Sequence, residues 1–500
     1  MKLLVRSVLL ILFIINIILA SWYVLHGDIF FTSDIGRDFL LLEELDAKKI
    51  VLIGPRSSGE IYHGPLWSYL NYPAYVFSRG NPVVVGWFWI MLAVLSTILS
   101  YFIGSRLFTK PVGVAYALMV SLYFTFHTRG MSHPHGAMIV IPLWFFYFIR
   151  YLQTQKMLYV AAHLFLCGIL VQLELALGIP LSILSLIALS WLFFRRRQYS
   201  YFVAFLLLPL TLSNFFIFDF RHGHLLFQKV LGFITPYQGG AFFDYTMFIK
   251  NRLFLLFTGT EILRRDPGGR NIILFLVTLL CIRVQLRDRK YSVIYLSFLY
   301  FYVGFFLLSF IDKGPILYVH LYPLFLLVFL IFCSFLESRY KTIFALLFVV
   351  IYGMNLTSSI GDVQDAAGYI GQHKYSWKFL EAMTRKVFEG PEKEFGYFVY
   401  SPDILGYDPK YAMHYTAKQS TKKAYSFKKM PVTYVVAAPH PPADPFMLDS
   451  WWRIHQVNMV KEPEQKIEFD NGYKIEKYTL TSQEQQVYFD PAIDPGLHFR

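Results

Sequence analysis

The chain has 500 residues, of which 56% are hydrophobic and 16% are charged. Soluble proteins carry about a quarter of charged residues, so this composition excludes a soluble protein. The formal net charge of +13 suits either a nucleic-acid binder or a membrane protein with basic loops, and its placement decides between them. All three cysteines lie in apolar runs, which excludes a disulfide framework and a thiolate metal cluster.

Apolar stretches long enough to cross a membrane recur through residues 1–360. A helix needs about 20 apolar residues to cross the bilayer core, and this count predicts about eleven transmembrane helices. We interpret the first as a membrane helix rather than a cleaved signal peptide, because no small-x-small cleavage site follows Ala20. The predicted helices begin near residues 7, 83, 111, 134, 157, 178, 199, 271, 291, 317 and 342.

The Lys and Arg residues of the loops gather on one side of this predicted topology. If the amino terminus is cytoplasmic and the spans alternate, the inner loops hold 15 basic residues against two acidic ones, Asp288 and Glu337. This is the positive-inside pattern of a membrane protein, and it accounts for the whole net charge. We therefore expect a multi-pass protein of the cell membrane with no nucleic-acid partner.

Three segments outside the spans fall on the outer side: residues 26–82, 219–270 and the tail, 361–500. β-branched and aromatic enrichment predicts strands at 395–401 and 431–438. Residues 376–388 have helical spacing. The sequence thus predicts a polytopic α-helical membrane protein with a small extracytoplasmic α/β domain at its C-terminus, which would recognise an acceptor, cover the site, or serve only for docking.

The first outer loop carries the acidic residues that suggest chemistry. A helix capped by Ser33 would place Asp34 and Asp38 on one face, with Arg37 beside them. The same three side chains would otherwise be an ordinary solvated face. We expect the apolar side of this helix to rest on the membrane surface through Phe39, Leu42 and Leu45.

A carboxylate just outside the membrane can act as a general base on an acceptor hydroxyl, and a nearby cation can stabilise a leaving phosphate. These two needs fit the transfer of a sugar from a lipid phosphate. Glu60 is a candidate second acid, and His63 would polarise the acceptor, contact phosphate, or merely cap the next segment. The second outer loop supplies cations, among which we select Lys250 and Arg252 as candidate phosphate ligands.

The first loop resembles that of the C-type glycosyltransferases, and within them glycosyltransferase family 39, the protein mannosyltransferases and lipid A aminoarabinose transferases. The matching residues are Asp34, Arg37 and the run His63-Gly-Pro-Leu-Trp-Ser-Tyr69. Ile35 stands in place of the second acid of the family's Asp-Glu pair, and Gly64 in place of its first proline. The resemblance covers roughly a fifth of the chain, from the first predicted span through the second.

The resemblance implies the C-type fold, a polyprenyl-phosphate sugar donor, an inverting transfer, and Asp34 as the catalytic base. Related enzymes place a cation near the outer end of the tenth predicted span, which makes His320 a candidate with its neighbour Tyr322. Some superfamily members use a divalent cation, Mg or Mn, which would lie beside Asp34 and Asp38, although the sequence itself requires no metal.

Two further patterns have competing interpretations. Glu174, near the outer end of the fifth predicted span, would face a cavity or lie in a wet turn. His133 and His135 have metal-like spacing, but without further ligands we interpret them as part of a turn between two spans.

Together these expectations describe an integral-membrane glycosyltransferase that acts at the extracytoplasmic face. Its partners would be the lipid-linked donor, membrane lipid, and a lipid, glycan or protein acceptor. The alternative is a transporter or flippase of lipid-linked sugars, which would require discontinuous helices and symmetry between halves that the sequence does not display. A membrane scaffold whose tail binds a partner is the remaining alternative.

Overall fold

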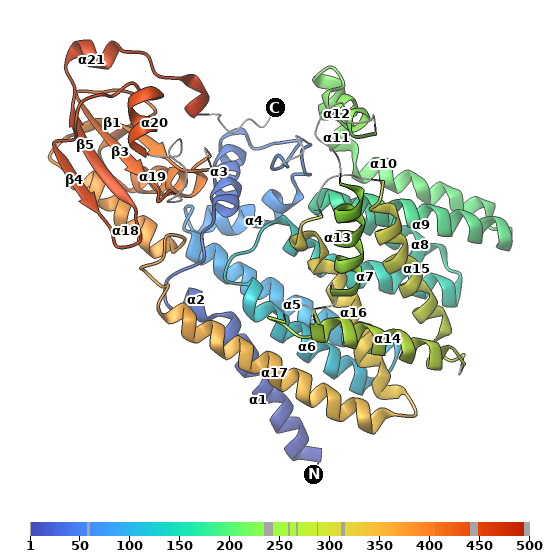
Figure 1. The fold of residues 1–500 in the computed structure, drawn as a ribbon. Helices are drawn as coiled ribbons and strands as arrows, with labels where there is room; N and C mark the ends of the chain where they lie inside the picture. The colour runs from blue at the N-terminus through green and yellow to red at the C-terminus, as the bar shows by residue number, and fades with distance from the viewer. Residues whose placement is uncertain are drawn as a thin grey trace.

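The structure is a computed structural model of the chain that describes residues 2–57, 61–234, 244–258, 261–266, 269–287, 289–311, 316–403, 405–440 and 449–494. Long helices form a bundle, and the C-terminal α/β region sits at one end of it beside helices α3 and α4 (Figure 1). We call this the domain-bearing end.

Each predicted span coincides with a helix or a helical run. Among the described residues, six helices are long and apolar enough to cross a membrane, or seven if the pair Tyr199–Thr211 and Ser213–Arg221, bent by 50°, is one span. The total of eleven crossings and the orientation stay predictions. The helices are α1 (Lys2–Ala20), α5 (Pro82–Leu107), α6 (Lys110–His127), α7 (His133–Thr154), α8 (Met157–Leu173), α9 (Leu175–Arg196), η1 (Tyr199–Leu206), α10 (Leu207–Thr211), α11 (Ser213–Arg221), α14 (Gly269–Arg287), α15 (Ser292–Leu308), η2 (Tyr318–Leu321), α16 (Tyr322–Ser334) and α17 (Lys341–Ala367).

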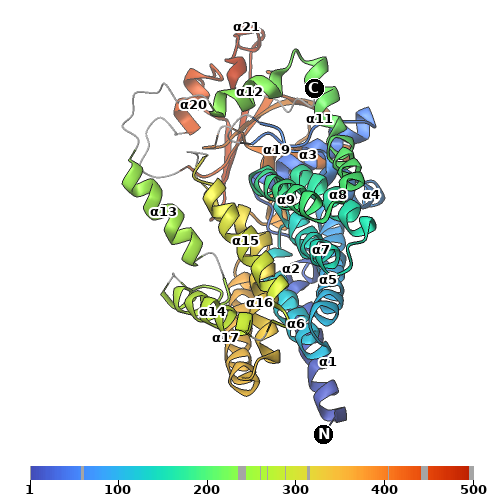
Figure 2. The same cartoon turned by 90° about the vertical axis from the view of Figure 1, so that its right-hand side faces the viewer.

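The first loop and the second long loop contain shorter helices. In the first loop, α2 (Trp22–Leu25), α3 (Ser33–Lys48) and α4 (Leu66–Phe77) lie at the domain-bearing end. In the second, α12 (Leu225–Ile234) and α13 (Tyr245–Thr258) precede α14. In Figure 2 α13 lies at the left edge of the molecule, well apart from α3.

The C-terminal region contains a five-stranded sheet in the order β2-β1-β3-β5-β4. β1 pairs in parallel with β2 and β3, whereas β5 is antiparallel to β3 and β4. The two strands and the helix predicted from the sequence are present as β1, β3 and α18, so the predicted α/β fold is confirmed. The elements are α18 (Trp377–Phe388), β1 (Glu394–Tyr400), α19 (Tyr407–Gln419), β2 (Lys423–Ser426), β3 (Val432–Ala437), α20 (Asp449–His455), β4 (Gln465–Glu468), β5 (Lys474–Thr479) and α21 (Ser482–Gln486).

The α/β region is fixed to the first loop by buried polar contacts. The carboxylate of Asp28 is buried and accepts hydrogen bonds from the Ser376 hydroxyl at 2.6 Å and from the backbone N–H groups of Gly371 and Lys378. The Tyr411 hydroxyl of α19 donates to the Gly80 carbonyl at 2.5 Å. Buried polar groups need such partners, so these bonds specify one docked position.

The helix predicted in the first loop exists, but two details of the prediction are wrong. Its N-cap is Thr32, because Ser33 is already helical. Its apolar side does not rest on the membrane surface: the ring of Phe39, 1% exposed, packs against Tyr411 of α19 and Tyr75 of α4. Leu42 and Leu45 are buried in the same core. The α/β domain and α4, and not lipid, therefore cover the apolar side of α3.

Candidate functional site

Helix α3 presents an ion-pair cluster at the domain-bearing end. Asp34, Arg37 and Asp38 lie within about one turn, so one guanidinium reaches both carboxylates. Arg37 Nη1 donates to Asp34 Oδ1 at 2.9 Å, and Arg37 Nη2 donates to Asp38 Oδ1 at 3.1 Å. The Asp34 side chain is 71% exposed, whereas that of Asp38 is 8% exposed. Only Asp34 therefore offers a carboxylate that a substrate can reach.

The environment of Asp38 differs from that of Asp34. Burial raises the pKa of Asp38 to about 6, the charge of Asp34 adds to the rise, and Arg37 opposes it. The carboxylate borders a small cavity between α3, α4 and α5 whose lining includes Trp67, Asn71 and Trp89. Asp38 is thus mostly ionised at neutral pH and takes up a proton near pH 6, and its carboxylate holds the Arg37 guanidinium in place.

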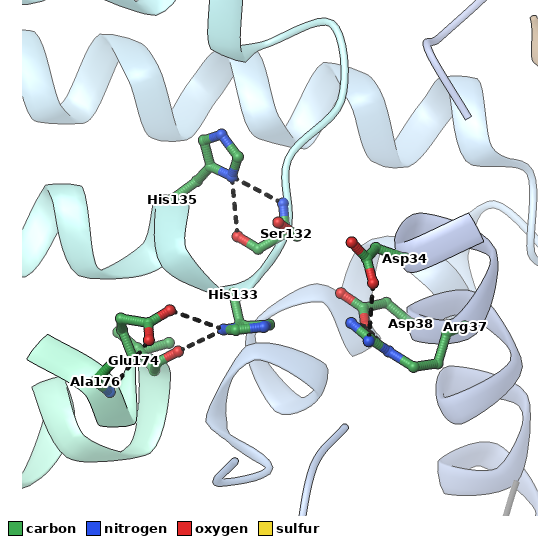
Figure 3. A network of polar contacts seen from close by, with 9 residues as sticks. Asp34, Arg37, Asp38, Ser132, His133, His135, Glu174 and Ala176 are labelled. Carbon is green, nitrogen blue, oxygen red and sulfur yellow. Dashed lines mark hydrogen bonds and ion pairs between the residues drawn. The ribbon is translucent and has the colours of Figure 1, made fainter. Parts of the chain in front are cut away.

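A histidine and a glutamate face this cluster from the other side (Figure 3). His133 begins α7, and Glu174 caps α9, its Oε1 accepting the Ala176 N–H at 3.3 Å. His133 Nδ1 lies 2.8 Å from the Leu173 carbonyl oxygen and 3.5 Å from Glu174 Oε2. The Leu173 carbonyl can only accept a hydrogen bond, so the proton of the neutral ring belongs on Nδ1 and Nε2 is left as an acceptor. In Figure 3 the ring points across to Arg37 and Asp38.

His63 contacts His133 on one side and is within electrostatic range of Arg37 of the α3 cluster on the other. Its ring lies 4.0 Å from that of His133, measured between centroids. Burial lowers the pKa of His63 to about 3, and the charges of Arg37 and His320 add to the effect. His63 is therefore neutral, and His320, in η2 before α16, is close enough to act on it electrostatically.

The structure explains why Gly64 stands where the resembled motif has its first proline. Its N–H donates to the Gln172 carbonyl at 3.0 Å, a bond that proline cannot make. A Cβ at this position would lie 2.6 Å from the Gln172 side chain. Glycine therefore lets the segment after His63 pack directly on α8.

The remaining predicted site residues lie elsewhere. Tyr322 packs its ring against His127, 4.6 Å between centroids, and against His135 at 5.9 Å. Lys250 and Arg252 lie on α13, away from α3, and Arg252 is buried with its guanidinium 4.8 Å from the Phe248 ring centre. Glu60 lies outside the described residues.

The structure thus brings Asp34, Arg37, Asp38, Glu174, His63 and His320 to one end of the bundle. His133 also belongs to this group, although we interpreted it with His135 as part of a turn between two spans. His133 and His135 lie one step beyond that turn, in the first turn of α7. Ser132 could have shown this in the sequence, because serine is a common N-cap residue and would place the helix start at His133. In the structure Ser132 is the N-cap of α7, and its N–H donates to the His135 ring at 3.0 Å.

The residues at this end do not fit the divalent cation that the family resemblance suggested. The guanidinium of Arg37 already lies between Asp34 and Asp38, where a cation would sit. Within the described residues, no group of three or more His, Cys, Asp or Glu side chains could hold a metal ion.

No protein-family model and no curated protein sequence matches the chain. Its structure is similar to that of ArnT from Cupriavidus metallidurans in the apo state, with a TM-score of 0.62 and 10% identity over 95% of this chain and 98% of that one. ArnT bound to undecaprenyl phosphate matches with a TM-score of 0.54 and 10% identity, over 96% and 98%. The oligosaccharyltransferase of Archaeoglobus fulgidus in the apo form matches with a TM-score of 0.46 and 12% identity, over 84% and 64%.

The two ArnT matches show that this chain shares a fold with ArnT along nearly its whole length. The predicted fold class, a multi-span helical membrane protein with a C-terminal α/β domain, is therefore confirmed, and its fold is like that of ArnT. The chain is a multi-pass membrane protein.

Proposed function

We propose that this protein is an integral-membrane glycosyltransferase that moves a sugar from a polyprenyl phosphate to an acceptor hydroxyl, with inversion, at the extracytoplasmic face. The observation that carries the proposal is the α3 cluster: a carboxylate that is 71% exposed, bonded to a guanidinium, at the domain-bearing end of the bundle. The similarity to ArnT, one of whose structures is bound to undecaprenyl phosphate, supports the nature of the donor.

In this proposal Asp34 accepts the proton of the acceptor hydroxyl as its oxygen attacks the anomeric carbon of the donor. The bond from that carbon to the phosphate oxygen breaks, and the polyprenyl phosphate leaves with the electron pair. Arg37 stabilises the charge that grows on the phosphate, because a guanidinium presents several donors to one anion. The acceptor oxygen attacks the anomeric carbon on the face opposite the leaving phosphate, so the configuration at that carbon is inverted.

His63, His133 and His320 form the opposite wall of this site. His63 and His133 stack on one another, and Glu174 and the Leu173 carbonyl fix the orientation of His133. Burial lowers the pKa of His63, so its imidazole is neutral and can bond sugar hydroxyls or phosphate without repelling Arg37. Lys250 and Arg252 stay predicted phosphate ligands from the α13 side.

The test is sugar transfer by the purified full-length chain. Polyprenyl-phosphate sugars carrying a labelled sugar are offered together with lipid, glycan and peptide acceptors, and nucleotide sugars serve as the control donors. We expect label on an acceptor only with lipid-phosphate donors. Movement of the donor between leaflets of a vesicle without any transfer would favour the flippase and contradict the proposal.

A further inference from the structure

The α/β domain touches α3 between its two candidate active residues. A Cβ added to Gly36 would lie 2.6 Å from the backbone N of Asp408 and from the carbonyl carbon of Tyr407. Real Cβ atoms do not approach other atoms so closely, so only glycine allows this contact. The first turn of α19 therefore meets α3 at a position flanked by Asp34 and Arg37.

This contact is held along the length of both helices. The carboxylate of Glu43, two turns further along α3, accepts from His414 Nδ1 at 3.0 Å and pairs with Lys418 Nζ at 3.0 Å. Together with the Tyr411 bond to Gly80, these contacts fix the start of α19 beside the α3 cluster. The domain is thus a fixed part of the candidate site.

The helix that contacts α3 is the one that follows the carboxyl end of β1. In open α/β sheets, ligands bind outside the carboxyl ends of parallel strands, where the chain connections diverge to either side. β1 connects through α19 to β2 on one side, while its other neighbour β3 leads on to β4 and β5. β1 ends at Tyr400, and the next helix of the domain, α19, begins at Tyr407.

Tyr407 is half-buried, and its hydroxyl lies among charged groups from both parts of the chain. Arg37 and Asp34 act on it from α3, Arg56 acts from the first loop, and Asp403 acts from the loop after β1. Burial raises the pKa of Tyr407, so the hydroxyl keeps its proton at neutral pH and can both donate and accept hydrogen bonds.

We propose that Tyr407 is an acceptor-binding residue, and that Asp403 with the first turn of α19 forms the acceptor side of the transfer site. Arg37 then faces the donor phosphate, Asp34 lies between the two substrates, and Tyr407 contacts the hydroxyl-bearing acceptor. This inference rests on the proposed function and deepens it by assigning the acceptor to the domain.

The experiment measures acceptor KM and kcat for the wild type, Tyr407→Ala and Tyr407→Phe, with the donor and acceptor that give transfer in the panel described above. Binding of undecaprenyl phosphate to each variant is measured alongside. Tyr425→Ala and Tyr425→Phe, on the edge strand β2, are the matched controls. Tyr407→Phe keeps the ring, so it serves if the alanine variant does not fold.

We expect Tyr407→Ala to raise the acceptor KM about tenfold, with phenylalanine restoring part of the loss and undecaprenyl phosphate binding unchanged. An unchanged acceptor KM in both variants, or an equal loss of undecaprenyl phosphate binding, would overturn the acceptor side while leaving the proposed function standing. Absence of transfer by the wild type with every donor would reject the proposed function, and the acceptor side with it.

Discussion

The two walls of the candidate site hold carboxylates in opposite conditions. On α3, Asp34 is 71% exposed and is held by a single guanidinium. On the α7 and α9 wall, the Glu174 side chain is 1% exposed, caps a helix and faces an imidazole. An exposed carboxylate can exchange a proton with an arriving substrate, whereas a buried one positions its neighbours. This difference assigns proton transfer to Asp34 on the α3 wall, and it assigns to Glu174 the role of holding the α7 and α9 wall in shape.

Asp34→Asn tests this assignment with the largest expected effect. The amide keeps the shape of the side chain but cannot accept the proton of the acceptor hydroxyl. We expect sugar transfer to fall by about 100- to 10,000-fold, the contribution typical of a general base. The matched control is Asp46→Asn, an exposed residue of the same helix that pairs with Lys49, and it should retain activity. Equal activity in the two variants would remove Asp34 from the mechanism.

Protonation of Asp38 should make the stability of the folded chain depend on pH. Its folded pKa of about 6 lies above the value near 4 of an unfolded chain. Between about pH 4 and pH 6 the folded chain therefore keeps a proton that the unfolded chain has lost, and the free energy of unfolding falls as the pH rises, by about 3 kcal/mol. Asp38→Asn removes this dependence.

The measurement is the melting temperature of the purified protein in detergent between pH 4 and pH 8. Burial also raises the pKa of Asp408, to about 7, so the wild-type curve contains a second decline. The difference between the wild type and Asp38→Asn isolates the first. Parallel curves for the two proteins would mean that Asp38 does not hold a proton in the folded chain.

Arg37→Lys tests the cation of the α3 wall. Lysine keeps the charge but loses the fork that bonds both carboxylates and a phosphate at once. We expect the affinity for undecaprenyl phosphate to fall about tenfold, close to 1.4 kcal/mol. Arg385→Lys, at an exposed pair with Glu381 in the α/β domain, should bind as the wild type does. Unchanged binding by Arg37→Lys would place the phosphate elsewhere.

Glu174→Gln tests the other wall and should have the smallest effect. The side-chain oxygen of glutamine still caps α9 by accepting the Ala176 N–H. We expect transfer to stay within about threefold of wild type, because the Leu173 carbonyl still orients His133. A loss larger than that of Asp34→Asn would reverse the comparison between the two walls.

The positions of the membrane helices could be predicted from the sequence because each apolar run is a local signal. The pairing of Arg37 with Asp34 and Asp38 was predictable for the same reason, since helical spacing brings them together. The burial of Phe39 was not, because its partner Tyr411 is far along the chain and an apolar helix face does not tell protein from lipid. Tyr407 was missed for a similar reason: only the docked domain brings it to Arg37.

The most direct measurement is an experimental structure of the full-length chain with undecaprenyl phosphate bound. The account predicts the phosphate at the domain-bearing end, within hydrogen-bonding distance of the Arg37 guanidinium, with the Asp34 carboxylate facing the space that the sugar would occupy. A phosphate bound without any contact to Arg37, with Asp34 turned away from it, would contradict the account.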